Sequence, residues 1–161
     1  MKLAVVIVED EPGVRDALER DLAPLHPAVR VEAASDVADA RGLLREIADD
    51  GDRLALLLAD HRLPGQTGVD LLVELHADDD TAGVRKVLVT GQADQDDTIR
   101  AVNEAGLHHY IAKPWDPEDL LSVVRDQLTG FVIDQDLDPL PHLAVLDAAR
   151  VMPLLGDRGD R

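Results

Sequence analysis

The 161-residue sequence contains no cysteine, and this absence excludes disulfide bonds, thiolate metal sites and thiol catalysis. No apolar run approaches the ~18 residues that a membrane-spanning helix needs, and the N-terminus carries no signal-peptide pattern. Aromatic residues are nearly absent too, with one Phe, one Trp and one Tyr, so no aromatic platform exists for stacking bases or a flavin ring. We therefore expect a cytoplasmic protein with an aliphatic core and no membrane partner.

Basic residues are also few, because 16 Lys and Arg stand against 33 Asp and Glu, for a net charge of −17. A surface of this sign repels phosphate backbones, so we expect no nucleic-acid partner. Only three of the basic residues are lysines. This scarcity draws attention to Lys113, which stands at the end of a predicted strand rather than in an obvious surface segment.

Apolar runs and amphipathic stretches alternate five times along the chain. This pattern predicts an α/β fold, namely a doubly wound, five-stranded parallel sheet with helices on both faces. The expected strands are Leu3–Val8, Val29–Ala33, Leu54–Ala59, Lys86–Val89 and His109–Ala112. The helices are expected to begin at Pro12, after Ser35 or Asp36, at Gly68 (ending near Ala77), near Asp94 and at Asp116, the fourth with Ile99, Val102 and Ala105 facing inward.

Past residue 128 the five-fold pattern ends. We divide the chain into a domain of residues 1–128 and a C-terminal helical extension of residues 129–161, too short for a second DNA-binding or catalytic domain. The extension is expected to form a short helix over Leu143–Met152 and a frayed tail over Gly156–Arg161.

Polar side chains follow four of the predicted strands. Glu9 and Asp10 follow the first, Asp60 follows the third, Thr90 follows the fourth and Lys113 follows the fifth. In an open parallel sheet the carboxyl ends of the strands form one edge, and this is where ligands bind. Three acids this close together call for a cation, and a set of oxygen ligands suits Mg²⁺.

Four short segments follow one another along the chain, each at a strand end. They are Val-Ile-Val-Glu9-Asp10-Glu11-Pro12, Leu-Leu-Ala-Asp60-His-Arg-Leu-Pro64-Gly65, Leu-Val-Thr90-Gly91 and Tyr110-Ile-Ala-Lys113-Pro114. With them the sequence resembles the receiver domain of bacterial two-component response regulators over about residues 1–128. The resemblance implies a flavodoxin-like (βα)5 fold and a stand-alone receiver with a short extension. A looser similarity is to receivers joined to thioredoxin-reductase-like flavoproteins, although this chain has no Cys-x-x-Cys or dinucleotide-binding glycine motif.

The resemblance implies that Asp60 accepts a phosphoryl group and becomes an aspartyl phosphate. Asp10, Asp60 and the backbone carbonyl of Arg62 would hold Mg²⁺, with Glu9 acting through water. Lys113 would neutralise charge on the transferring oxygens. The phosphoryl donor would be a histidine kinase or a phosphotransfer protein. The chain would then be no enzyme beyond catalysing its own phosphorylation and dephosphorylation.

The family also implies a switch, in which the hydroxyl of Thr90 bonds the phosphoryl group and Tyr110 turns inward. The surface of the fourth helix, fifth strand and fifth helix would then bind a downstream target protein. Arg62 and Gln92 stand where side chains influence the access of water to the phosphoryl group. The Lys113–Pro114 bond is expected to be cis, as is usual in the family.

Three other functions compete with this interpretation. The first is a pseudo-receiver that works without phosphorylation. The second is an aspartate-nucleophile phosphatase of the haloacid-dehalogenase type, which needs an acid where Arg62 stands. The third is a flavodoxin-like FMN carrier, whose phosphate the acids at positions 9–11 would repel. His61, His108 and His109 show no ligand spacing and are expected to be solvated.

The apolar residues Val124, Leu128, Phe131 and Val132 continue a helical stripe beyond the receiver, and Leu143, Leu146 and Met152 follow. A sheet already covered on both faces leaves little room for them, and an exposed apolar patch usually marks an interface. We therefore expect a homodimer through the extension. The alternative is an extension that folds back on its own receiver and covers the surface between the fourth and fifth helices.

Overall fold

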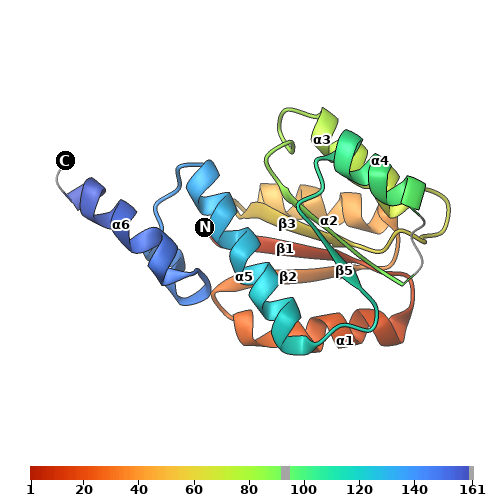
Figure 1. Cartoon of the computed structure of the whole chain (residues 1–161), viewed down its shortest axis with the longest axis horizontal. Coiled ribbons are helices and arrows are strands. Elements are labelled where there is room, and N and C mark those ends of the chain that lie inside the picture. The colour runs from red at the N-terminus through yellow and green to blue at the C-terminus, as the bar shows by residue number, and fades with distance from the viewer. Residues whose placement is uncertain (92–94, 160–161) are drawn as a thin grey trace.

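The computed structural model describes residues 1–91 and 95–159 of the chain. Its centre is one sheet of five parallel strands in the order β2-β1-β3-β4-β5, which confirms the predicted topology (Figure 1). The strands are β1 Leu3–Val8, β2 Val29–Ala34, β3 Arg53–Ala59, β4 Arg85–Thr90 and β5 His109–Ala112.

Helices cover both faces of the sheet. The α-helices are α1 Pro12–Leu22, α2 Val37–Asp49, α3 Gly68–Ala77, α4 Gln95–Ala105, α5 Pro117–Asp134 and α6 Ala148–Gly159, and 3₁₀ helices span Ala23–Leu25 and Leu140–Val145. Helices α1 and α5 pack on one face, and α2, α3 and α4 on the other. The doubly wound α/β class is therefore confirmed.

Local sequence signals explain where several helices begin. Asp36 caps α2 by accepting a 2.7 Å hydrogen bond from Asp39 N, which selects one of the two predicted caps. Thr67 and Asp70 form a reciprocal capping box at the start of α3. Asp116 accepts from two backbone amides at the start of α5, where Pro117 occupies the first turn.

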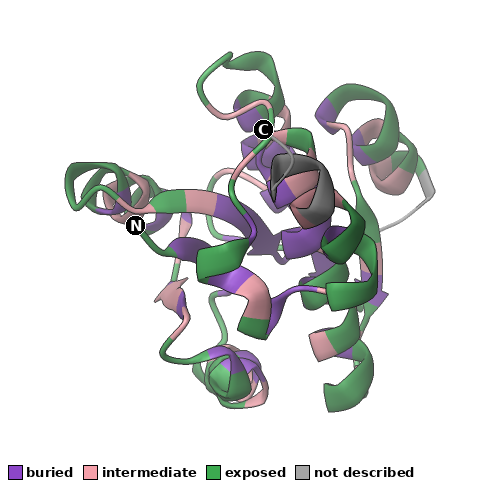
Figure 2. Cartoon of the chain, turned by 90° about the vertical axis from the view of Figure 1, so that its left-hand side faces the viewer, coloured by how far each residue is buried: buried purple, intermediate pink, exposed green. Residues whose placement is uncertain are grey.

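The core is aliphatic on both faces of the sheet, as the scarcity of aromatics requires. All six residues of β1 have 0% exposure, because this strand lies between β2 and β3 and under helices on both sides. Figure 2 shows buried residues gathered on the inner elements and exposed residues on the outer surfaces of the helices. Phe131 is the one aromatic residue in the core, at 2% exposure.

The predicted inward face of α4 is wrong in part. Ala105 is buried as expected, but Ile99 and Val102 are 48% and 54% exposed, and Ala101 takes the inner position with Ala105. Helix α4 packs beside α3, and two alanines one turn apart allow the backbones to approach closely. The larger aliphatic side chains therefore lie on the outer side.

The extension also differs from its prediction. Helix α5 continues to Asp134, and the stripe expected to be exposed is buried, at 2% exposure or less for each of Val124, Leu128, Phe131 and Val132. The single helix predicted over Leu143–Met152 is a 3₁₀ helix followed by α6, and helix α6 reaches Gly159 in the segment predicted to fray.

The extension covers this apolar stripe within the same chain. Val145, Leu146 and Val151 join the core cluster that contains Phe131, and Asp147 N donates a 2.9 Å hydrogen bond to Thr129 Oγ1. The end of α5 lies at the amino ends of the strands, since Asp134 pairs with Arg85 at the start of β4. The chain thus folds back, but at the end of the sheet away from α4 (Figure 1).

Among the residues that the structure describes, none of the helices is long and apolar enough to cross a membrane. The predicted division of the chain at residue 128 falls inside α5 and stays a prediction.

Candidate functional site

Three acidic residues meet at the carboxyl edge of the sheet, as the sequence predicts. Glu9 follows β1 with 1% exposure, and Asp60 follows β3 with 7% exposure, whereas Asp10 is exposed. One carboxylate oxygen from each of the three lies within 4.8 Å of the others. Two buried carboxylates and an exposed one therefore share a volume small enough for a single ion.

Lys113 is the cationic partner of the buried acids. Its Nζ donates hydrogen bonds to Glu9 Oε2 at 2.9 Å and to Asp60 Oδ2 at 3.2 Å. Burial raises the pKa of Glu9, although the bond from Lys113 opposes the rise. Burial favours the neutral amine of Lys113, but the two carboxylates outweigh it, so the pKa of Lys113 is raised. One ammonium against three acids leaves the site negative.

The donor set fits a divalent cation. Asp60 Oδ1 is buried and, within the described part of the chain, has no hydrogen-bond partner. Mg²⁺ prefers carboxylate and carbonyl oxygens together with water, and the site opens to solvent through a pocket of about 340 Å³. The pocket is lined by Asp10, Glu11, Asp60, Arg62, Thr90, Gly91 and Lys113, so every predicted site residue except the buried Glu9 and the switch residue Tyr110 lines it.

The backbone ladder of the sheet continues into the site and fixes these residues. Asp60 N donates to Val8 O and Glu9 N to Ala34 O, each at 3.0 Å, and Lys113 N donates to Thr90 O at 3.3 Å. The positions of the functional groups therefore follow directly from the parallel pairing of the strands.

Gly68 is a site residue that the sequence reasoning missed. A Cβ atom at this position would stand 1.9 Å from the carbonyl oxygen of Asp60, which no side chain tolerates. Gly68 N also donates a 2.9 Å hydrogen bond to His61 O. The available signal was a glycine directly after the helix cap Thr67, but the close approach of α3 to Asp60 is a tertiary contact without a sequence pattern.

His61 is not solvated, contrary to the prediction. It is 9% exposed, and its Nε2 lies 3.0 Å from Asp97 Oδ2 on α4. His61 lies in the loop after β3, and its side chain reaches the neighbouring helix α4. His108 also has a partner, since its Nδ1 accepts from Lys86 N, and desolvation lowers the pKa of His108 to about 4. His109 is exposed as expected.

The two predicted switch residues are in contact. Thr90 is 2% exposed at the end of β4, and the hydroxyl of Tyr110 on β5 donates a 3.2 Å hydrogen bond to the carbonyl oxygen of Thr90. The Lys113–Pro114 bond is cis, as expected. Gln92 and Asp94, which the sequence analysis assigned to water access and to a helix cap, lie outside the described residues.

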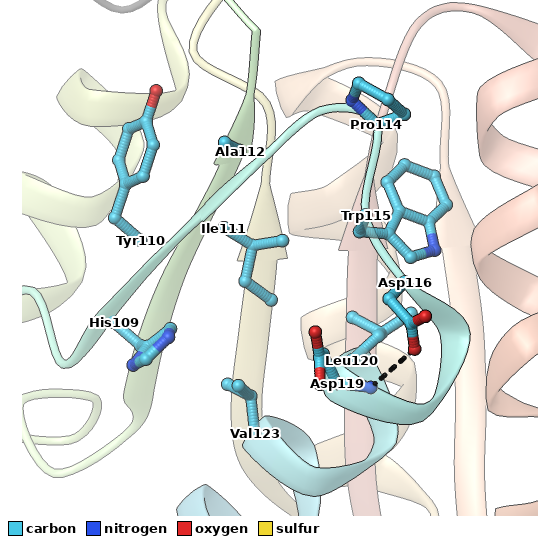
Figure 3. A pocket seen from close by; sticks show the side chains of 10 residues that line it. All are labelled: His109, Tyr110, Ile111, Ala112, Pro114, Trp115, Asp116, Asp119, Leu120 and Val123. Carbon is cyan, nitrogen blue, oxygen red and sulfur yellow. Dashed lines mark hydrogen bonds between the residues drawn. The ribbon is translucent and has the colours of Figure 1, made fainter.

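A second pocket, of about 230 Å³, lies between β5 and the start of α5 (Figure 3). Figure 3 shows Ile111 directed toward Leu120 of α5, with Tyr110 on the opposite side of the strand. Trp115 closes one end and is held by a 2.8 Å hydrogen bond from its Nε1 to Asp21 Oδ2. This pocket shares no lining residue with the acidic site, although Tyr110 of this pocket is hydrogen-bonded to Thr90 of the other.

The chain matches the response regulator receiver domain family over residues 5–125 and belongs to that family. It is similar to the hydrogenase transcriptional regulatory protein HoxA of Cupriavidus necator, with 32% identity over 157 residues, 98% of this chain and 30% of the relative. It is also similar to the transcriptional regulatory protein AruR of Pseudomonas aeruginosa, with 34% identity over 122 residues, 76% of this chain and 48% of the relative.

The fold matches that of a CheY-like response regulator receiver domain protein from Methanospirillum hungatei JF-1. The TM-score is 0.70 at 28% identity, and the match covers 83% of this chain and 99% of the other. The chain thus spans a third to a half of the curated regulators named above, but nearly all of a receiver domain. It is a two-component signalling domain of a family that is generally not enzymatic.

Proposed function

We propose that this receiver accepts a phosphoryl group on Asp60 from a histidine kinase or a phosphotransfer protein, and signals by binding a target protein. The observation that carries the proposal is the state of Asp60. One of its oxygens is paired with Lys113, and the other is buried without a partner beside Glu9 and Asp10. Such a carboxylate is held in place while keeping one oxygen free of hydrogen bonds.

In the proposed reaction, an oxygen of Asp60 attacks the phosphorus of a phosphohistidine. The new P–O bond forms as the P–N bond breaks, and the leaving imidazole takes up a proton. The ammonium of Lys113, already within 3.2 Å of Asp60 Oδ2, would compensate charge on the transferring oxygens. Mg²⁺ held by Asp10, Asp60 and the carbonyl of Arg62, with Glu9 through water, would neutralise further charge there.

A pseudo-receiver that never carries a phosphoryl group is the second candidate. Such a domain needs no pairing of a lysine with buried acids, and the burial of Glu9 and Asp60 would only cost it free energy. The pairing of Lys113 with the buried Glu9 and Asp60, beside Thr90, favours the phosphorylated form.

The proposed output surface consists of α4, β5 and α5. The hydroxyl of Thr90 would bond a phosphoryl oxygen, and the contact between Thr90 and Tyr110 would pass the change to β5. The exposed side chains of Ile99 and Val102 on α4, and the pocket between β5 and α5, offer apolar surface for a target protein.

The expectation of no nucleic-acid partner is not supported by the relatives. HoxA and AruR are named transcriptional regulatory proteins, and MtrA of Mycolicibacterium smegmatis, 30% identical over 128 residues, is named a DNA-binding response regulator. This chain spans 51% of that MtrA, so the binding of DNA by the whole regulator is not assigned to the matched part. The proposal concerns protein partners, and the cytoplasmic location stays a prediction.

A homodimer through the extension remains part of the proposal, but the apolar surface available for the contact is smaller than the sequence suggested. The stripe on α5 is covered within the chain, and the large apolar side chains still exposed on the described extension are Leu140 at 59% and Met152 at 55%. Light scattering of the chain and of Met152→Glu tests it. A dimer that the substitution dissociates supports the proposal, and a monomeric wild type contradicts it.

The phosphoacceptor proposal is tested with acetyl phosphate as a small donor and intact-mass measurement. The wild type should gain one phosphate in the presence of Mg²⁺ and none after chelation. Asp60→Asn, which keeps the shape of the side chain, should gain none under either condition. A wild type that never gains phosphate would favour the pseudo-receiver.

A further inference from the structure

The loop that follows β3 is held from two sides. From α3, Gly68 packs against the carbonyl of Asp60 and donates its N–H to His61 O. From α4, the carboxylate of Asp97 pairs with the side chain of His61, and Asp97 Oδ2 lies 3.0 Å from His61 Nε2. His61 thus joins the loop that follows Asp60 to the first turn of α4.

The His61–Asp97 bond reaches the first turn of α4. Ala101 and Ala105 anchor the later turns of α4 in the core, and Arg100 pairs with Asp70 of α3 at 2.6 Å. Asp97 belongs to the first turn and keeps 35% of its side chain exposed, whereas the side chain of His61 is 11% exposed. The imidazole therefore reaches from the buried side of the loop to a half-buried acid on the helix.

Folding alone gives little reason for a histidine at this position. His61 Nδ1 is buried and has no hydrogen-bond partner among the described residues, and such a polar atom costs free energy that an aliphatic side chain would not. The hydrogen bond from Nε2 to the carboxylate of Asp97 is charge-assisted and therefore strong, and it offsets the cost of the buried Nδ1. A link between the loop and α4 is what distinguishes histidine from leucine here.

We propose that His61 is a positioning residue that couples the phosphorylation state of Asp60 to the first turn of α4. The inference rests on the proposed phosphorylation of Asp60. A phosphoryl group adds charge and three acceptor oxygens directly before His61, and a shift of this loop pulls or releases Asp97 through the imidazole. The connection is separate from the contact between Thr90 and Tyr110. Coupling is reciprocal, so losing the bond also changes the affinity of the site for a phosphoryl group.

The test uses beryllofluoride with Mg²⁺ as a phosphoryl analogue on the full chain. Hydrogen exchange of the α4 amides is followed with and without the probe. His61→Leu removes the donor, and His61→Gln retains an amide N–H near the position of Nε2. Asp97→Ala removes the acceptor, and Asp97→Asn retains an acceptor oxygen. Asp96→Ala, an exposed neighbour in the same helical turn, matches the loss of charge and of helix-dipole stabilisation.

The wild type, His61→Gln, Asp97→Asn and Asp96→Ala should show a probe-dependent change of exchange in α4. His61→Leu and Asp97→Ala should lose this change and bind beryllofluoride roughly tenfold more weakly, the size expected for one charge-assisted hydrogen bond. The double variant should be no worse than either single variant, because both remove the same bond.

Wild-type responses in both His61→Leu and Asp97→Ala would overturn the coupling while leaving Asp60 as the phosphoacceptor. A loss in Asp96→Ala equal to that in Asp97→Ala would also overturn it, because helix charge rather than the bond would then be responsible. A wild type that does not bind beryllofluoride would overturn the phosphoacceptor proposal and this inference with it. Since Asp97 is partly exposed, Asp97→Ala keeps the test decisive even if His61→Leu fails to fold.

Discussion

The ammonium of Lys113 lies 2.9 Å from the carboxylate of Glu9, which is only 1% exposed. Even with this partner, burial keeps the pKa of Glu9 above its ordinary value. The site is therefore electrostatically strained in the absence of a cation, because Lys113 divides its charge between Glu9 and Asp60. We therefore expect the burial of Glu9 to cost stability when no cation is present.

Glu9→Gln should stabilise the protein at neutral pH in the presence of a chelator. A folded-state pKa raised above the unfolded value of about 4.5 means that the folded protein binds the proton more tightly. The contribution of Glu9 to stability therefore falls as pH rises from that value through the folded pKa. Urea unfolding should show a higher midpoint for the variant at pH 7, with the difference shrinking below the unfolded pKa. A less stable variant at pH 7 would contradict this account.

Thr90→Ala should leave phosphorylation by acetyl phosphate largely intact but uncouple it from Tyr110. The hydroxyl of Thr90 is proposed to bond the phosphoryl group after transfer, whereas the carbonyl of Thr90, which holds Tyr110, remains in the variant. NMR of the Tyr110 ring with and without beryllofluoride checks this. Thr90→Ser, which restores the hydroxyl, should recover the response. Equal loss of phosphate uptake and of the Tyr110 response would show that the two roles are not separable.

Gly68→Ala should lower the free energy of unfolding by more than about 2 kcal/mol, because the added methyl group must displace the carbonyl of Asp60. Phosphate uptake should fall as well. Gly42→Ala in α2 is the matched control, since a Cβ there meets nothing within 4 Å, and it should raise stability by about 0.5–1 kcal/mol. Chemical denaturation measures both, and a neutral Gly68→Ala would show that α3 yields without moving Asp60.

Val151→Ala should destabilise the chain by roughly 1–3 kcal/mol, because this residue is fully buried against the cluster that contains Phe131. Its neighbour Met152 is 55% exposed, and Met152→Ala should change stability by less than about 0.5 kcal/mol. Thermal unfolding of the two variants tests whether α6 docks on its own receiver. Equal, small effects would mean that α6 is undocked in solution.

Much of the fold could be predicted from the sequence because strand and helix signals agree locally. The bounds of β1 and α3 match their predictions. The apolar run of β1 ends unambiguously at the acids that follow it. The face of α4 was mispredicted because apolar periodicity cannot show that alanines, and not Ile99 and Val102, meet α3. Tertiary packing decided that outcome.

The residues of the candidate site were predictable because parallel strands bring their carboxyl ends to one edge. Residues that act through contacts were not, since nothing in the sequence shows that Gly68 touches the carbonyl of Asp60 or that His61 reaches Asp97. The prediction that the apolar stripe of the extension is exposed was wrong for a related reason. A stripe of Leu, Val and Phe looks the same whether a second chain or the chain's own 3₁₀ helix and α6 cover it.

Reduction of the phosphorylated protein with borohydride tests the central claim most directly, because borohydride converts an aspartyl phosphate to homoserine at the modified residue. After treatment with acetyl phosphate and Mg²⁺, peptide mapping by mass spectrometry should find homoserine at position 60 and at no other acid. Homoserine at another position, or a phosphate retained on a residue that borohydride leaves unchanged, would contradict the assignment of Asp60 as the phosphoacceptor.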